Sequence, residues 1–158
     1  MAVKEKDLAK PAKQLQQTLN EQLANWSVAY FKLHHFHWYV KGPHFPVLHA
    51  KFEELYNLSA LKLDELAERM LAIGLEPAST MKEYLSLASI KEGGKTGGNE
   101  ADMLEIVVAD FEKMAEGLKE AGTMAEEEAE DGPTADLLYG QVEELQKQIW
   151  MLKATLGK

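Results

Sequence analysis

The chain has 158 residues, a formal net charge of −9 at pH 7 and no cysteine. The lack of cysteine excludes a disulfide scaffold, thiolate metal sites and thiol redox chemistry. An acidic surface repels nucleic acid on average and suits cations, including metal ions. Because the sequence has neither a secretory-signal pattern nor a run of about 18 apolar residues, we expect a cytoplasmic protein that contacts no membrane.

Long segments rich in helix formers lie between the prolines and glycines, and they predict five helices. In chain order the predicted helices cover residues 11–39, 46–73, 79–88, 100–128 and 133–156. Pro11 and Pro133 fall in first turns, where proline is tolerated, and Ser79 and Thr80 offer a cap for the short third helix. Along the first helix an apolar stripe at helical spacing ends in His37, which we therefore expect to point inward or into an interface.

Four long helices with one longer crossing segment predict an all-α fold: a ferritin-like four-helix bundle with a short extra helix between the second and third long helices. Residues 11–158 would form this single domain, and residues 1–10 a mobile N-terminal tail. The stretch KEGGKTGGNE, residues 91–100, is expected to be a flexible linker. If the second and third long helices run parallel, the connection between them must return along the bundle.

The second long helix has two working faces when its residues are placed on a wheel at 100° per residue. One face is apolar and is expected to meet the subunit's own core through Leu48, Phe52, Leu55, Ser59, Leu63, Leu66, Met70 and Ile73. The second face carries His49, Glu53, Asp64 and Glu68 among Tyr56, Ala60, Leu61, Ala67 and Leu71. Because water alone would not favour leucines there, we expect this second face to meet a partner.

The second face presents two pairs of possible metal ligands, His49 with Glu53 and Asp64 with Glu68, each spaced i,i+4. His49 and Asp64 are separated by roughly 22 Å of helix and cannot hold the same ion. If two copies of the helix pack antiparallel about a two-fold axis, however, the start of one meets the end of the other. A site would then combine His37 and His49 of one subunit with Asp64 and Glu68 of the other.

Imidazole and carboxylate ligands without sulfur suit iron, manganese or zinc. The sequence contains neither Glu-x-x-His nor His-Glu-x-x-His, so it lacks the signatures of a di-iron centre within one bundle and of a zinc protease. The alternative is that Asp64 and Glu68 are ordinary solvated residues, since acidic i,i+4 pairs are common. His34, His35 and His44 are interpreted as bystanders near the surface.

Two stretches, KLHHFHWYVKGPHFPVLHAKFEELY and DELAERMLAIG, resemble the signature of the Dps mini-ferritins, the DNA-binding proteins from starved cells, and most of all the Bacillus-type members. The likeness continues in EYLSLASIKE, TADLL and QIWMLKATLG. The resemblance implies a hollow homo-oligomer, a dodecamer of four-helix bundles. It also implies a ferroxidase that oxidises ferrous iron, preferably with hydrogen peroxide, and stores ferric mineral, which protects against oxidative stress.

The resemblance also implies a role for individual side chains. The inter-subunit ferroxidase ligands correspond to His37, His49, Asp64 and Glu68. Glu53 corresponds to an acidic position for a second iron, so each site would take up to two irons, with zinc or manganese able to substitute. Trp38 corresponds to an aromatic residue beside the site and is either an electron donor or a packing residue. Iron would enter through acidic three-fold pores, whose candidate lining residues are Glu127, Asp131 and Asp136.

Some residues depart from the pattern of that family. Ala50 stands where a glutamate is expected, and Pro46 and Val47 stand where aromatic and hydroxylated residues are usual. Leu58 and Leu61 make the middle of the second long helix more apolar. None of these changes removes an expected ligand. They bear on local packing at the two-fold interface, and through it on metal affinity or assembly.

Two other functions remain as alternatives. A DNA-compacting architectural protein would need a basic tail or patch, and nucleoid association would follow from it. Here Glu5 and Asp7 interrupt the four tail lysines, Lys4, Lys6, Lys10 and Lys13, so the charge does not favour DNA binding. The other alternative is a helical assembly scaffold with a degenerate metal site.

Overall fold

The computed structural model describes residues 8–93 and 98–158, and in these ranges all regular secondary structure is α-helical. The helices are α1 (Lys10–Tyr39), α2 (Phe45–Ala72), α3 (Met81–Leu87), α4 (Glu100–Glu127) and α5 (Gly132–Thr155). All five predicted helices are confirmed, and every boundary lies within two residues of its expected position. Residues 1–7 of the predicted tail and 94–97 of the predicted linker lie outside the described residues.

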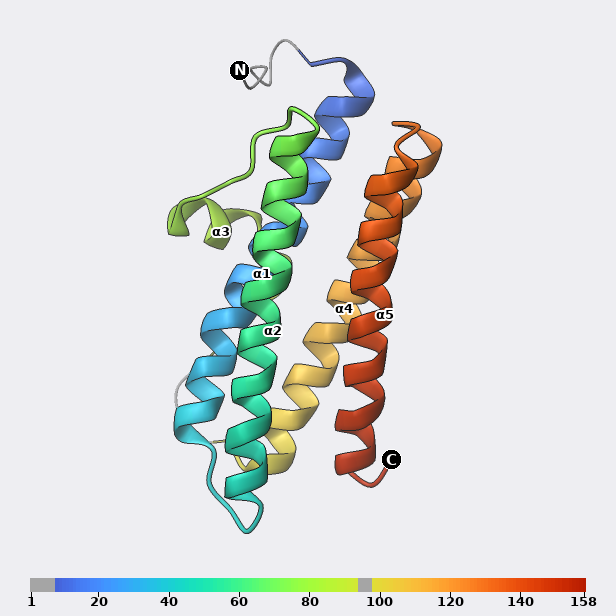
Figure 1. Ribbon diagram of the computed structural model, residues 1–158. Coiled ribbons are helices and arrows are strands. Elements are labelled where there is room, and N and C mark those ends of the chain that lie inside the picture. The colour runs from blue at the N-terminus through green and yellow to red at the C-terminus, as the bar shows by residue number, and fades with distance from the viewer. Residues whose placement is uncertain (1–7, 94–97) are drawn as a thin grey trace.

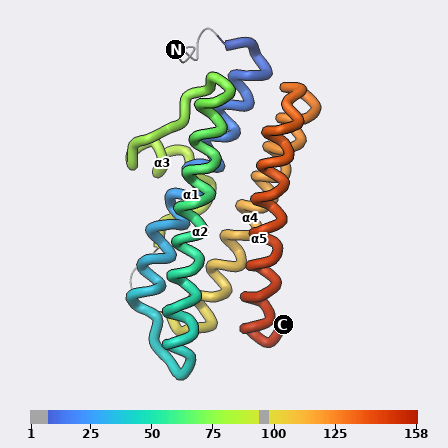
Figure 2. The backbone as a smooth tube through the Cα atoms, viewed as in Figure 1, coloured from blue at the N-terminus to red at the C-terminus, as the bar shows by residue number. Residues whose placement is uncertain are grey.

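The four long helices form a bundle in which α2 and α4 run parallel (Figure 1). A crossover leaves the end of α2, carries α3 and returns to the opposite end of the bundle, where α4 begins; α3 packs against α1 (Figure 2). This confirms the expected ferritin-like arrangement with one long connection. As a result, the α1–α2 turn, the start of α4 and the end of α5 lie at one end of the molecule (Figure 1).

A buried tryptophan links three of the helices. Trp26 of α1 is fully buried, and its Nε1–H donates to Gln141 Oε1 of α5 at 2.9 Å. The Gln141 amide in turn donates to the Lys62 backbone oxygen of α2 at 3.2 Å. Because buried polar groups are costly unless they are paired, this chain of hydrogen bonds specifies how α1, α2 and α5 pack.

Helix α2 shows both of its expected faces. The core face is confirmed: most of its predicted members are buried, namely Leu48, Phe52, Leu55, Ser59, Leu66 and Met70. On the second face, Leu61 and Leu71 are 62% and 58% exposed in the single chain. Both leucines are therefore free in the single chain to meet a partner, as the sequence predicts.

The structure corrects the expectation for Leu58. From the sequence, this leucine was one of the departures from the family pattern that were expected to affect packing at the two-fold interface. Leu58 is half-buried and packs against the core. Its charged neighbours on the wheel reach across to α5, where Lys51 Nζ donates to Gln148 Oε1 at 2.7 Å and Arg69 Nε donates to Thr134 Oγ1 at 2.9 Å. The face that carries Leu58 therefore lies toward α5, and the leucine fills space within the subunit.

Polar side chains of α1 hold the crossover. The Asn25 side-chain oxygen accepts from the backbone N–H groups of Ser89 at 2.8 Å and Ile90 at 3.3 Å. Buried Lys32 donates to the Lys91 backbone oxygen at 2.9 Å and pairs with Asp110 of α4 at 2.7 Å. Burial raises the pKa of Asp110, although the Lys32 ammonium opposes that shift. These contacts fix the crossover and α4 against α1, and the start of α4 lies at the same end of the bundle as the α1–α2 turn.

Candidate metal centre

His37, near the end of α1, and His49, in the first turns of α2, lie face to face across the α1–α2 turn. Their rings are stacked, with centroids 3.7 Å apart and planes 12° apart. His37 Nδ1 lies 2.6 Å from the backbone oxygen of His49, and His49 Nδ1 lies 2.7 Å from the backbone oxygen of His37. A carbonyl oxygen only accepts, so both Nδ1 atoms carry the proton. In the neutral rings both Nε2 atoms then keep a free lone pair for a metal ion.

An aromatic cluster surrounds this histidine pair. Tyr56 of α2 packs edge-on against His37 with ring centroids 5.3 Å apart and stacks on His34 at 3.6 Å. Loss of solvation, followed by the charge and hydrogen bonding of Glu53, raises the pKa of Tyr56. The phenol therefore stays neutral and lies beside the carboxylate that was predicted for a second iron. Wheel angles alone grouped Tyr56 with the second face but did not reveal its contacts with His34 and His37.

Trp38 differs from its aromatic neighbours because it is largely open to solvent. Its side chain is 66% exposed, and its ring lies 5.5 Å from that of His34. Phe45, at the start of α2, stacks on His49 with centroids 5.0 Å apart. Tyr56 and Phe45 thus pack against the histidine pair, and Trp38 joins this cluster through His34.

The predicted carboxylate ligands, Asp64 and Glu68, are both exposed on α2. Helix rise places Asp64 roughly 22 Å along the axis from His49. Throughout residues 8–93 and 98–158, the single chain brings no three His, Asp or Glu side chains together in a way that could hold an ion. One chain therefore contributes two imidazoles at one place on the face and two carboxylates at another.

The three predicted pore residues lie around the α4–α5 turn. Glu127 and Asp136 are exposed. Asp131 instead caps α5: its carboxylate accepts from the Thr134 N–H at 3.1 Å and from Arg69 Nη2 at 3.2 Å. Partial burial acts to raise the pKa of Asp131, but the Thr134 hydrogen bonds and the Arg69 charge together lower it. Of the three predicted pore residues, only Glu127 and Asp136 therefore keep exposed carboxylates.

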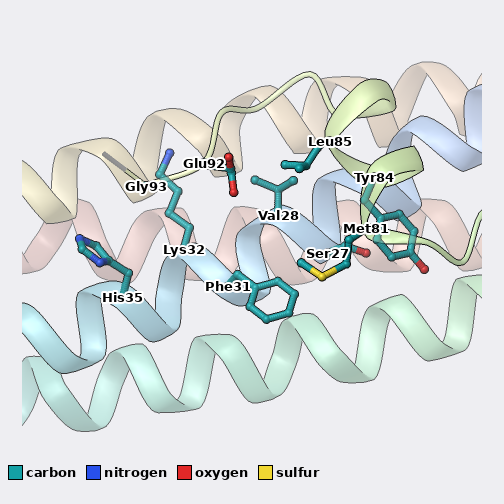
Figure 3. A pocket seen from close by; sticks show the side chains of 10 residues that line it. All are labelled: Ser27, Val28, Phe31, Lys32, His35, Met81, Tyr84, Leu85, Glu92 and Gly93. Carbon is teal, nitrogen blue, oxygen red and sulfur yellow. The ribbon is translucent and has the colours of Figure 1, made fainter. Parts of the chain in front are cut away.

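A groove of about 260 Å³ lies between α1 and the crossover with α3. Figure 3 shows its apolar side chains, which include Val28, Phe31 and Leu85, with Lys32 and His35 farther along α1. It contains none of the predicted ligands and is separate from the candidate centre. Among the described residues, no helix is long and apolar enough to cross a bilayer.

Comparisons with known proteins agree with the ferritin-like bundle described above. The ferritin-like domain model matches residues 16–158. The chain is 50% identical to DNA protection during starvation protein 2 of Bacillus anthracis, over 92% of this chain and 99% of that protein. It superposes on a Dps protein from Bacillus brevis with a TM-score of 0.90 and 45% identity, covering 94% and 99% of the two chains.

A more distant relative adds a chemical class. The Dps protein of Vibrio cholerae is described as a member of a broad superfamily of ferritin-like diiron-carboxylate proteins. The two chains share 34% identity with a TM-score of 0.86, over 92% of this chain and 91% of that one. Fold, coverage and identity agree, and the chain belongs to the Dps family of ferritin-like proteins.

Proposed function

We propose that this protein oxidises ferrous iron at sites shared by two subunits, prefers hydrogen peroxide as oxidant and stores the ferric product inside a hollow dodecamer. The observation that carries the proposal is the reciprocal pair of Nδ1 hydrogen bonds between His37 and His49, which leaves the Nε2 lone pair of each stacked ring free. A merely structural histidine pair would not need both of these nitrogens free. The superfamily of the Vibrio cholerae relative supports iron as the metal.

The exposed face of α2 supports a shared site. Leu61 and Leu71 flank Asp64 and Glu68, and an antiparallel second copy would cover both leucines. The same contact would bring the carboxylates of one subunit to the histidines of the other, twice per two-fold axis. In this assembly the two half-sites form complete ones without any rearrangement of the chain.

The donor set suits iron as a substrate. Imidazole nitrogen and carboxylate oxygen bind Fe²⁺, and hard carboxylate oxygen favours the oxidised ion; manganese and zinc suit the same donors. Glu53, which interacts with Tyr56, is proposed to help bind a second iron. Two Fe²⁺ ions give one electron each to H₂O₂, which with two protons becomes two water molecules. A single Fe²⁺ supplies only one electron and would release a hydroxyl radical.

Trp38 is proposed as the donor of a missing electron when only one iron is bound. Its side chain is largely exposed, and its ring lies next to that of His34, which stacks on Tyr56. A purely packing role predicts no change in radical yield when Trp38 is replaced by phenylalanine. Glu127 and Asp136 are proposed to line the path by which iron enters, since their carboxylates are exposed at one turn.

The test is to load the purified protein with Fe²⁺ without oxygen, add one H₂O₂ per two irons, and record ferric absorbance and trapped hydroxyl radical. The wild type should oxidise iron rapidly with little radical. The Asp64→Ala/Glu68→Ala variant should oxidise iron no faster than buffer. The matched control is Glu116→Ala/Glu120→Ala, an exposed acidic i,i+4 pair on α4, which should behave as wild type. Unchanged oxidation in the first variant would overturn the proposal.

Direct DNA binding is the second candidate, because the Bacillus anthracis relative is named for DNA protection during starvation. The net charge of −9 opposes it, and tail residues Lys4 and Lys6 lie outside the described residues. Consumption of Fe²⁺ and peroxide would itself protect DNA in the cytoplasm without contact. A gel shift separates the two: DNA retention that falls steeply with salt would show binding and nucleoid association.

A further inference from the structure

We propose that Glu100, the first residue of α4, is a positioning residue that holds the α1–α2 turn so that His37 and His49 meet in ligand geometry. The inference rests on the proposed function in one respect: its test measures metal binding by His37 and His49. Glu100 touches neither histidine of the pair. It acts through the turn between them, which it reaches from 56 residues away in the sequence.

Both carboxylate oxygens of Glu100 bind His44, the residue that precedes α2. The His44 backbone N–H donates to Oε1 at 2.7 Å, and the His44 ring Nδ1 lies 2.8 Å from Oε2. The Glu100 side chain is only 15% exposed, although the His44 side chain is 70% exposed. The hydrogen bond from the His44 side chain is the main cause that lowers the pKa of Glu100. The carboxylate is therefore charged at neutral pH and fits under the turn.

The turn is shaped to receive this carboxylate. Gly42 has φ of +143°, a conformation that residues with a side chain rarely adopt. A Cβ at position 42 would also lie 2.4 Å from Glu100 Oε1, so the carboxylate and the backbone are in direct contact. Glycine at this position thus serves both the backbone conformation and the approach of Glu100.

Glu100 also supplies what the start of α2 lacks. His44 occupies the N-cap position, and its own side chain makes no capping hydrogen bond. A carboxylate from α4 satisfies the N–H of that residue and places negative charge at the positive end of the α2 dipole. The first turn of α2, which carries His49, is therefore held by a different helix.

The histidine pair depends on the geometry of this turn. Each ring donates to the backbone of the other residue, so the end of α1 and the start of α2 must keep a fixed offset. Phe45 N–H donates to the Gly42 oxygen at 3.1 Å, which closes the turn locally. Without Glu100 the turn would lose its tie to α4, and the two Nε2 atoms would be less well aligned for one ion.

Cobalt(II) is the probe, because its visible absorption reports ligand geometry as well as affinity. Glu100→Ala should weaken Co²⁺ binding about tenfold and change the absorption bands. Glu100→Gln keeps one oxygen for the His44 N–H and should restore most of the affinity. His44→Ala retains the backbone bond and should have a small effect. Glu112→Ala is the matched control, since Glu112 is a glutamate of α4 that pairs with Lys153 far from the turn.

Thermal unfolding and light scattering on each variant confirm that fold and assembly persist. If Glu100→Ala binds Co²⁺ with wild-type affinity and spectrum, the positioning role is wrong. If Glu100→Gln falls as far as Glu100→Ala, a general loss of negative charge explains the effect and the inference also fails. Failure of the proposed function has a different signature: wild-type Co²⁺ binding would not respond to His37→Ala or His49→Ala.

Discussion

The two halves of the predicted metal site lie toward opposite ends of α2, with His37 of α1 completing the first half, and they are built in opposite ways. At the start of α2, His49 is stacked on His37, hydrogen-bonded to its backbone and covered by Phe45. Farther along, Asp64 and Glu68 extend from an exposed face. The imidazole half is complete within one folded chain, whereas the carboxylate half has its position only through the helix that carries it.

This difference follows from what each ligand needs. A histidine ligand must have one ring nitrogen protonated and the other free for the metal. A hydrogen bond from the protonated nitrogen to a fixed acceptor selects that tautomer and orients the ring. A carboxylate accepts through either oxygen and can adjust its rotamer when an ion arrives. The chain therefore organises the ligands that need orientation and leaves flexible ligands to be brought by the partner, so assembly would complete the site.

The largest expected effect comes from blocking the contact between the two halves. In Leu61→Glu/Leu71→Glu two charges replace the exposed leucines, and an antiparallel copy would face them with two more. Like charges at such a contact cost several kcal/mol, so the oligomer should dissociate and iron oxidation should fall to the rate in buffer. Light scattering and ferric absorbance measure the two losses together.

The fold of this variant should survive, because both leucines are more than half exposed in the single chain. Ile106→Glu is the control, since Ile106 is an exposed apolar residue of α4, and it should leave the oligomer intact. An oligomer of wild-type size in the double variant would place the subunit contact elsewhere. The shared site would then lose its structural basis.

A smaller effect distinguishes the two halves by stability. In the dissociated Leu61→Glu/Leu71→Glu background, His49→Ala should lower the free energy of unfolding by about 1–3 kcal/mol, through the lost hydrogen bond and ring stack. Glu68→Ala should change it by no more than about 0.5 kcal/mol, as is usual for surface substitutions. Urea unfolding followed by circular dichroism gives both values.

Equal losses for His49→Ala and Glu68→Ala would contradict the comparison, because they would mean that the carboxylate half is also built into the monomer. In the assembled protein both single substitutions should nevertheless impair iron oxidation. A divided site therefore predicts that His49→Ala and Glu68→Ala differ in their effect on stability but both impair iron oxidation.

The helices were predictable because prolines and glycines mark their ends, and helical periodicity identified the core face of α2. Periodicity also placed Leu61 and Leu71 outside the core face, and both are exposed in the single chain. It could not place Leu58 correctly, since a wheel shows angles but not which neighbouring helix lies at each angle. Lys51 and Arg69 are charged neighbours of Leu58 on the wheel, yet both reach across to α5.

The candidate site was predictable to the level of residue types and less so to the level of contacts. Joining His37 to His49 needed only a short turn between two helices. The bond between His44 and Glu100 spans a crossover whose path depends on polar contacts of α1, and no local pattern encodes it. His44 was interpreted as a bystander because its sequence neighbours provide no partner for it.

The smallest expected effect concerns an ion pair that ties the carboxylate end of α2 to the α4–α5 turn, from Arg69 to Asp131. Asp131→Ala removes the α5 cap and should cost about 1 kcal/mol near neutral pH. Because the pKa of Asp131 is lowered in the folded protein, its charge stabilises the fold above the ordinary aspartate value of about 3.9, and that stabilisation is lost as the pH falls through the lowered pKa. The difference in unfolding free energy between wild type and variant should therefore shrink on acidification, whereas a constant difference would show that the charge of Asp131 contributes nothing to this tie.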